Sequence, residues 1–374
     1  MSAVPTGPLE GMAPRRPTRR VYVGPVPLGG GAPVVVQSMC STRTNDPQAT
    51  LAQIDRLAKA GCEIIRVAVQ DRGSLEGFRE IVAGSLLPVV ADIQFSADLA
   101  VRSIDAGAAK VRINPGNIGG PDGVRRVADA ARAAGIPVRV GVNAGSLAED
   151  IRSEHGGVTA AALVESARRQ VSALESFGFG DVVVAIKASD ARRTIDACRL
   201  LADATDCPQH LGVTEAGLPR AGLVKSAYAL GTLLSEGIGD TLRVSLTADP
   251  VEEVRAGWEI LRCVGLRKRG PELISCPTCS RCEIDLIGLA ESVEDALAEI
   301  AEPMTVAVMG CVVNGPGEAR EADVAVCAEK GGGLITRRGE VMRRVSESEI
   351  PGALLDEVRA LVRGREARKA GECS

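Results

Sequence analysis

Three cysteines lie at intervals of three residues in the segment ISCPTCSRCEIDL, at Cys276, Cys279 and Cys282. Thiolates at this spacing are typical ligands of a structural zinc ion or of an iron–sulfur cluster. The pattern does not match the Cys-X-X-X-Cys-X-X-Cys of radical enzymes that use S-adenosylmethionine. The next thiol, Cys311, lies in the loop MGCVVNGPGEAREADV, which also carries Glu318. The spacing predicts a metal site but leaves open which metal binds and whether Cys282 is the fourth ligand.

A second group of polar residues lies at the ends of short apolar segments rich in Val and Ile. Within one segment these residues are two or four positions apart, so they share one face of a strand. The group consists of Arg66, Asp92, Arg112, Asn114, Arg139, Asn143, Lys187, Glu215, Arg243, Ser245 and Thr247.

The charges of this group predict its ligand. Five cations beside two carboxylates favour a ligand with several negative charges, such as a diphosphate. One or two of the cations could instead only form ion pairs within the fold. Acid–base chemistry would fall to Glu215 or Asp92. His210 begins its apolar segment, and we expect it to be a packing residue.

The elements that must position these residues alternate regularly along the chain. Short apolar segments predict buried parallel strands, and the stretches between them, rich in Ala, Leu, Arg and Glu, predict helical crossovers. The predicted strands are residues 33–38, 63–69, 88–94, 110–114, 137–143, 181–187, 210–215 and 241–247. Eight such units within about 230 residues predict a TIM barrel, whose active site lies at the carboxyl ends of its strands. A doubly wound sheet would need a glycine-rich turn after its first strand, and QSMCSTRTND contains no glycine.

The chain divides into four predicted parts. Residues 1–30 are expected to form an irregular arm, whose paired arginines at 15–16 and 19–20 are solvated. Residues 31–263 form the TIM barrel, residues 264–272 a linker, and residues 273–374 a small α+β domain that carries the cysteines. Within this last domain we expect a helix near 291–300, strands at 305–310 and 322–326, and a hairpin after three successive glycines.

Composition excludes several classes of function. The net charge is −4 and the pI is near 5.6, which is not the pattern of a nucleic-acid-binding protein. Aromatic residues make up 2% of the chain, too few for platforms that stack bases. No apolar run approaches the roughly 20 residues that cross a bilayer, and the amino terminus does not match a secretory signal. We therefore expect a cytoplasmic protein whose 11 cysteines stay reduced.

Several longer motifs, taken in order along the chain, resemble one known family. They are KVRINPGN (110–117), GVNAGSL (141–147), IKASD (186–190), LGVTEAG (211–217), GIGDTLRVSLTADPVEE (237–253), ISCPTC with EIDL, and MGCVVNGPGEAREADV (309–324). Together they resemble the 4-hydroxy-3-methylbut-2-enyl diphosphate synthase family of the methylerythritol phosphate route to isoprenoids. The resemblance runs from about residue 33 to about residue 345.

The resemblance implies a TIM barrel followed by a small α+β iron–sulfur domain, and a two-electron reductase. Its substrate would be 2-C-methyl-D-erythritol 2,4-cyclodiphosphate, which is opened and dehydrated to a linear allylic diphosphate. The diphosphate contacts implied by the resemblance are Arg66, Arg112, Arg139, Asn143, Lys187, Arg243 and Ser245. Glu215 would be the acid–base residue, and Asp92 a carboxylate beside the substrate.

The same resemblance implies a cofactor and partners. Cys276, Cys279, Cys311 and Glu318 would hold a [4Fe-4S] cluster. Reduced flavodoxin or ferredoxin would donate the electrons. Two chains would form a homodimer in which the cluster domain of one chain covers the barrel of the other.

The chain departs from the family pattern at three positions. Cys282 and Cys40 stand where threonine is expected, and Gln94 stands where histidine is expected. We predict that Cys282 is not a cluster ligand, and that Gln94 changes a hydrogen bond at the rim of the site without loss of function. The roles of Cys327 and Cys373 stay open. Two alternatives remain: a barrel with a structural zinc module, and a pterin-type transferase, which would leave the motif MGCVVNGPGE without a purpose.

Overall fold

A computed structural model describes residues 12–282, 284–311 and 315–372 of the chain. The chain folds into two compact units, Met1–Lys268 and Arg269–Ser374, which are described separately. The boundary lies between helix α9 (Pro250–Cys263) and strand β11 (Pro271–Ser275). Among the described residues, no helix combines the length and the apolar character needed to cross a membrane.

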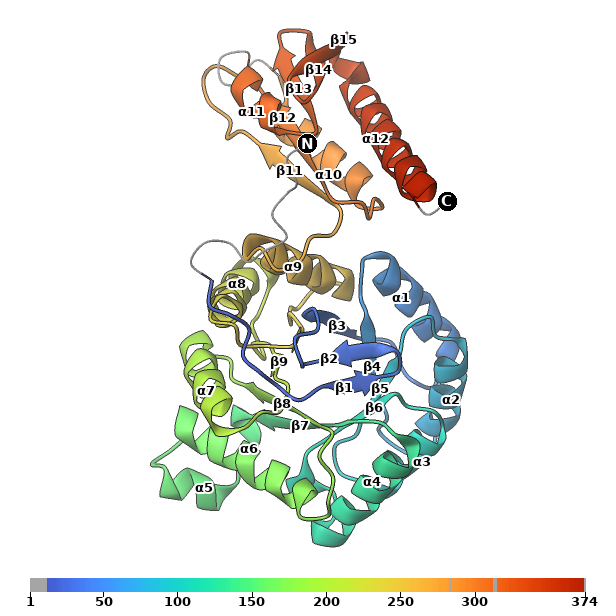
Figure 1. Ribbon diagram of the computed structural model, residues 1–374, viewed down its shortest axis with the longest axis vertical. Coiled ribbons are helices and arrows are strands. Elements are labelled where there is room, and N and C mark those ends of the chain that lie inside the picture. The colour runs from blue at the N-terminus through green and yellow to red at the C-terminus, as the bar shows by residue number, and fades with distance from the viewer. Residues whose placement is uncertain (1–11, 283, 312–314, 373–374) are drawn as a thin grey trace. The chain divides into compact units, whose positions relative to one another are not determined.

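Eight parallel strands form the wall of the first unit (Figure 1). They are β3 (Val35–Met39), β4 (Ile64–Ala68), β5 (Val89–Asp92), β6 (Lys110–Ile113), β7 (Val138–Asn143), β8 (Val182–Lys187), β9 (His210–Leu211) and β10 (Thr241–Leu242). Their order is β8-β7-β6-β5-β4-β3-β10-β9, and a bridge between Val184 and Gln209 closes the ring. The prediction of a TIM barrel is confirmed.

The last two barrel strands are shorter than the predicted 210–215 and 241–247, with two residues each. The chain leaves the ladder after β9, where the N–H of Thr214 donates a hydrogen bond to the carbonyl of Ala188 at the end of β8. The irregular segments that follow β9 and β10 continue around the mouth of the barrel.

The crossovers outside the barrel are helical. They are α1 (Pro47–Lys59), α2 (Ser74–Gly84), α3 (Ala97–Asp105), α4 (Gly120–Ala134), α5 (Glu149–Glu154), α6 (Ala160–Glu175), α7 (Ala191–Ala204), α8 (Pro219–Ser235) and α9. Side chains of Asp46, Ser96, Thr159 and Asp190 cap the starts of α1, α3, α6 and α7. Outward strand residues, mainly Val and Ile, pack against these helices in one apolar core. The alternate strand residues therefore face the inside of the barrel.

A hairpin closes the amino-terminal end of the barrel. β1 (Val21–Val23) and β2 (Val26–Leu28) pair antiparallel, and their buried side chains pack onto Val35, Ile64, Val90 and Val183 of the wall. The prediction that residues 1–30 are irregular is therefore wrong for residues 21–28. The two prolines in this segment, which disfavour strands, argued against a hairpin.

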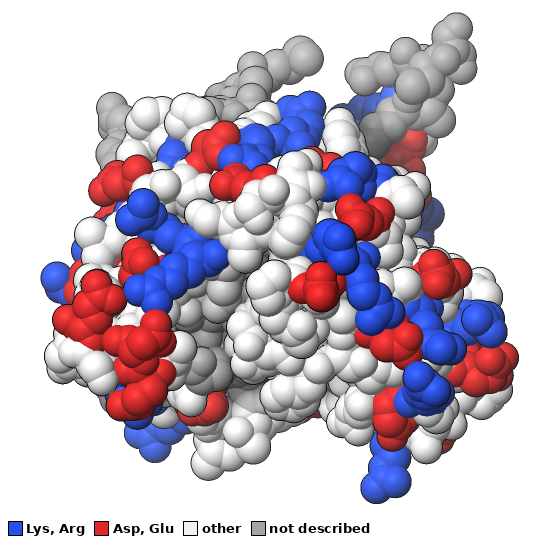
Figure 2. Space-filling model, turned by 90° about the horizontal axis from the view of Figure 1, so that it is seen from below, with Lys and Arg blue, Asp and Glu red and all other residues white. Residues whose placement is uncertain are grey.

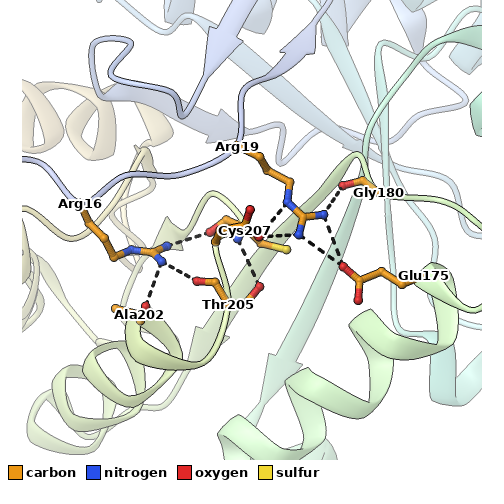
Figure 3. Close-up of polar contacts among 8 residues, drawn as sticks. Arg16, Arg19, Glu175, Gly180, Ala202, Thr205 and Cys207 are labelled. Carbon is orange, nitrogen blue, oxygen red and sulfur yellow. Dashed lines mark hydrogen bonds and ion pairs between the residues drawn. The ribbon is translucent and has the colours of Figure 1, made fainter.

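Residues 12–20 cross the same end of the barrel and are held there by arginines (Figure 3). Arg16 and Arg19 bond to acceptors on the barrel: the carbonyls of Ala202, Thr205, Cys207 and Gly180, and the carboxylates of Glu175 and Asp206. Arg15 pairs with Asp240 at 3.0 Å. The prediction that the paired arginines are solvated is wrong for Arg15, Arg16 and Arg19, because the ends of helices and strands leave carbonyls that need donors, whereas Arg20 is exposed.

The second unit is a five-stranded sheet covered by helices on both faces (Figure 1). Its strands are β11, β12 (Met304–Met309), β13 (Val324–Glu329), β14 (Gly332–Arg337) and β15 (Glu340–Ser346), and β13, β14 and β15 pair antiparallel. Helices α10 (Leu286–Leu297) and α12 (Ile350–Glu372) pack on one face, and α11 (Gly315–Glu321) packs on the other. The predicted α+β domain with its glycine-initiated hairpin is confirmed.

Charged side chains of both signs are interspersed on the face of the molecule drawn in Figure 2. Many pairs lie within one helix, such as Arg132 with Asp129 and Arg169 with Glu165. Exposed pairs of this kind contribute little to stability. An excess of positive charge is found inside the barrel instead.

Candidate functional site

A cavity of about 210 Å³ opens at the carboxyl ends of the barrel strands. It is lined by Met39, Arg66, Asp92, Gln94, Arg112, Arg139, Asn143, Lys187, Val213, Thr214, Arg243 and Ser245. Eight of the nine barrel residues that the family resemblance implies as site residues are thus brought together, whereas Asn114 and Thr247 of the strand-end group are not among the lining residues. Glu215 is exposed and is not among the lining residues, although Thr214 beside it is.

The strand register places charged residues of three neighbouring strands side by side. Asp92 on β5 pairs in register with Arg112 on β6, and Arg112 pairs with Arg139 on β7. Two glycines leave space for the long side chains: a Cβ at Gly141 would lie 2.8 Å from Arg112 Nε, and one at Gly212 would lie 2.6 Å from Lys187 Nζ. Side chains at these two positions would displace the cations from the cavity.

Asp92 is the carboxylate at the centre of this arrangement. Its Oδ1 lies 2.9 Å from Arg112 Nη1, its Oδ2 lies 3.5 Å from Arg66 Nε, and Gln94 donates to Oδ1 at 3.4 Å. Burial raises the pKa of Asp92, but Arg66, Arg112 and Arg139 together outweigh it, so the pKa is below its ordinary value. Asp92 is therefore held ionised.

The cations outnumber the carboxylates that face them. Burial lowers the pKa of Arg66 to about 10 although Asp92 opposes the shift. Burial, and then neighbouring arginines, also lowers the pKa of Arg139 and of Lys187 well below their ordinary values. A site with this imbalance favours a polyanionic ligand, which would relieve the repulsion between the cations.

Sequence reasoning missed Glu253, which lies outside the cavity on α9 but orients one of its residues. Glu253 is buried, and its Oε2 lies 3.0 Å from Arg243 Nη2 while its Oε1 accepts a hydrogen bond from Leu246 N at 2.8 Å. A carboxylate on a helix is ordinarily solvated, so the sequence carries no direct signal for this role. Met39 was also missed, and its Sδ lies 2.9 Å from Arg66 Nη2.

Glu215 has an unusual backbone. Its φ is +53°, in the left-handed region that residues with a Cβ rarely adopt. Such strain is concentrated at functional sites, where the surrounding structure holds it.

The second candidate site is a cavity of about 130 Å³ in the C-terminal unit, lined by Cys276, Pro277, Cys279, Arg281, Met309, Cys311 and Gly315. The Sγ of Cys276 accepts a hydrogen bond from Gly310 N at 3.3 Å, a contact typical of sulfurs that bind iron. Three thiols at one cavity, with a backbone donor to one of them, fit an iron–sulfur cluster. Among the described residues, no three His, Cys, Asp or Glu side chains converge closely enough for a single metal ion.

Cys282 is not among the residues that line this cavity. Its Sγ donates to the carbonyl of Ile284 at 3.4 Å and packs against Gly310, where a Cβ would lie 2.8 Å away. Glu318 is exposed in the first turn of α11. Residues 312–314 of the same loop, and Cys373, lie outside the described residues.

Two family models match the chain. The GcpE TIM-barrel domain matches residues 18–258, and the GcpE protein C-terminal domain matches residues 272–360. The chain belongs to the GcpE family. The family resemblance read from the motifs is confirmed.

Relatives of this GcpE chain carry one name. Proteins named 4-hydroxy-3-methylbut-2-en-1-yl diphosphate synthase (flavodoxin) are 52% identical in Geobacter sulfurreducens, over 92% of this chain and 98% of that protein, and 52% identical in Salinispora arenicola, over 96% and 91%. Among solved structures, a dihydropteroate synthase from Yersinia pestis is 11% identical, with a TM-score of 0.48 over 66% of this chain and 96% of that chain, a likeness too low to bear on function.

Proposed function

We propose that this GcpE chain is a 4-hydroxy-3-methylbut-2-enyl diphosphate synthase. It opens 2-C-methyl-D-erythritol 2,4-cyclodiphosphate and gives the linear 4-hydroxy-3-methylbut-2-enyl diphosphate in isoprenoid precursor biosynthesis. One C–O bond to the diphosphate breaks, one hydroxyl leaves as water and a C=C bond forms, so two electrons and two protons balance the reaction. The observation that carries this proposal is the single cavity lined by cations from separate barrel strands.

The barrel residues bind and orient the cyclic diphosphate. Arg66, Arg112, Arg139 and Lys187 neutralise its phosphates, and further hydrogen bonds come from Asn143, Arg243 and Ser245. Asp92, held ionised by the arginines, accepts a hydrogen bond from a substrate hydroxyl. Glu215 is the acid–base residue, and its strained backbone in the segment that follows β9 supports that role.

The cofactor is a [4Fe-4S] cluster held by Cys276, Cys279, Cys311 and Glu318. When bound, such a cluster transfers single electrons, and an iron held by carboxylate exchanges that ligand more readily than one held by thiolate. Cys282, which lies outside the cavity lining, is not a ligand. Reduced flavodoxin is the proposed electron donor because the relatives are named for it, and ferredoxin is the alternative.

We further propose a cytoplasmic homodimer. Among the described residues, no two cysteines are joined by a disulfide, which suits a reducing compartment. The barrel cavity and the cysteine cavity belong to separate compact units of the chain. The homodimer, in which the cluster domain of one chain covers the barrel of the other, rests on the family resemblance.

The proposal is tested by purifying the protein without oxygen and measuring iron, sulfide and zinc together with product. We expect brown protein with iron and sulfide, and formation of the linear diphosphate when the cyclic substrate and reduced flavodoxin are added. Colourless protein that contains zinc would favour the structural zinc module instead.

A further inference from the structure

A titratable side chain lies one layer below the cations that line the barrel cavity. Lys110 on β6 precedes Arg112 by two residues and so shares its inward face. It has no exposed surface, and its Nζ has no hydrogen-bond partner among the described residues. An unpaired ammonium in such a place is costly, which disfavours the protonated form of this amine.

A second pair of titratable groups lies near the same layer. Lys187 Nζ on β8 lies 3.3 Å from His210 Nε2 on β9, and His210 is buried, with no partner for its Nδ1 in the described part of the chain. The sequence suggested a packing role for His210, but a ring nitrogen in contact with a cavity-lining amine connects it to the site.

The groups that face this layer are almost all cationic. Around it stand Arg66 on β4, Arg112 on β6, Arg139 on β7 and Arg243 at the end of β10, with neutral Gln37 on β3 bonded to Thr241. Of the described residues that line the cavity, Asp92 on β5 is the one carboxylate, and Glu253 on α9 is engaged by Arg243. Below this layer, the side chains that pack between the β1–β2 hairpin and the barrel strands are apolar.

This environment disfavours positive charge on the layer while the cavity holds no anion. Burial, and then Arg139 and Arg66, hold the pKa of Lys110 and of Lys187 well below its ordinary value. Burial, and then Arg139, Lys187 and Lys110, lowers the pKa of His210 in the same way. An anion placed among the same cations acts in the opposite direction and favours the protonated forms.

We propose that Lys110 and His210 beneath the cavity, together with Lys187 in its wall, form a proton-accepting layer, and that binding of the diphosphate draws protons from solvent onto this layer. The inference rests on the proposed diphosphate site and deepens it. Full positive charge is reached only when the ligand brings enough negative charge to stabilise it. The layer therefore makes the site selective for diphosphates over ligands with a single negative charge.

The test is calorimetric titration of the oxidised holoenzyme with the cyclic diphosphate, without oxygen and without an electron donor, so that no turnover occurs. Both phosphates of this ligand are strong acids, so the ligand does not titrate near neutral pH. The binding enthalpy is measured in several buffers of different ionisation enthalpy. We expect it to vary with the buffer, with uptake on the order of one proton per site at about pH 8.

Variants show where the protons go. Lys110→Met keeps the volume of the side chain, and we expect it to reduce the proton uptake and to weaken binding about tenfold. Lys225→Met, which makes the same substitution on the exposed face of α8, should leave both unchanged.

The outcomes separate the two claims. Binding with the same enthalpy in every buffer would overturn the proton-accepting layer alone, and this result needs no variant. Full proton uptake by Lys110→Met would overturn it as well. The wild-type holoenzyme could also give no binding heat in any buffer, and no shift of its unfolding temperature when the cyclic diphosphate is added. That result would contradict the proposed diphosphate site and, with it, the proton-accepting layer.

Discussion

At the scale of single residues, the site depends on carboxylates that fix the cations. Glu253 is the clearest case, because one buried carboxylate holds both Arg243 and the backbone of Leu246. Its neighbour Glu252 is exposed and pairs with Arg255 on the same helix. The two glutamates therefore form a matched pair for mutagenesis.

Glu253→Gln should raise KM for the cyclic diphosphate about tenfold with a smaller change in kcat, because Arg243 loses the charge that orients it. The free energy of unfolding should fall by about 1–3 kcal/mol. Steady-state kinetics and urea unfolding measure the two effects. Glu252→Gln should change neither, and an unaltered KM in Glu253→Gln would mean that Glu253 is only structural.

We predict opposite effects for substitutions of Cys282 and of Glu318. Cys282→Ser should keep the iron and sulfide content and the activity, because its thiol does not line the cysteine cavity. Glu318→Gln should lose most of the activity, because an amide is a weaker ligand than a carboxylate. Metal analysis of both proteins, purified without oxygen, checks this. The ligand assignment is wrong if the serine variant loses the cluster while the glutamine variant keeps cluster and activity.

We predict that the contribution of Asp92 to the free energy of unfolding depends on pH. Its pKa is lower in the folded chain than the ordinary value of about 4, so its stabilising effect is present above that value and is lost as the pH falls through the folded pKa. The difference in unfolding free energy between wild type and Asp92→Asn should stay constant above about pH 5 and shrink as the pH falls below about 4, through the lowered pKa of Asp92. Urea unfolding across this range measures it. A difference that stays constant would show that ionisation of Asp92 does not contribute.

At the scale of elements, the amino-terminal arm stabilises the barrel from the end opposite the cavity. Arg16 supplies donors to three carbonyls at the end of α7 and in the loop that follows (Figure 3). Arg16→Ala should therefore lower the unfolding free energy of the barrel by about 1–3 kcal/mol and leave KM unchanged. Arg192→Ala removes an exposed pair within α7 and should cost less than about 0.5 kcal/mol. Equal effects of the two variants in urea unfolding would contradict the role of the arm.

The barrel could be predicted from the sequence because buried parallel strands form continuous Val and Ile runs that polar helices interrupt. The residues at the strand ends were predicted for the same reason, since every second position faces inward. Glu253, Lys110 and the hairpin at 21–28 required the structure. Their positions depend on which helix, strand or arm packs against the barrel interior, and local periodicity does not encode such long-range contacts.

At the scale of the whole molecule, the chain consists of two compact units with different chemistry. The barrel unit carries the cation-lined cavity, and the C-terminal unit carries the cavity lined by Cys276, Cys279 and Cys311. The central claim is that both cavities serve one reaction. Each is incomplete alone, because a diphosphate site has no source of electrons and a cluster site has no means of holding the substrate.

The most direct test of this claim is the number of electrons consumed per product formed. Reduced flavodoxin is added without oxygen to the holoenzyme and a limited amount of the cyclic diphosphate, and flavodoxin oxidation and linear diphosphate are measured together. We predict two electrons per product for the wild type, and neither product nor oxidation beyond background for Arg139→Met or Cys311→Ser. Sustained oxidation of flavodoxin without product, or product formed by either variant at the wild-type rate, would contradict it.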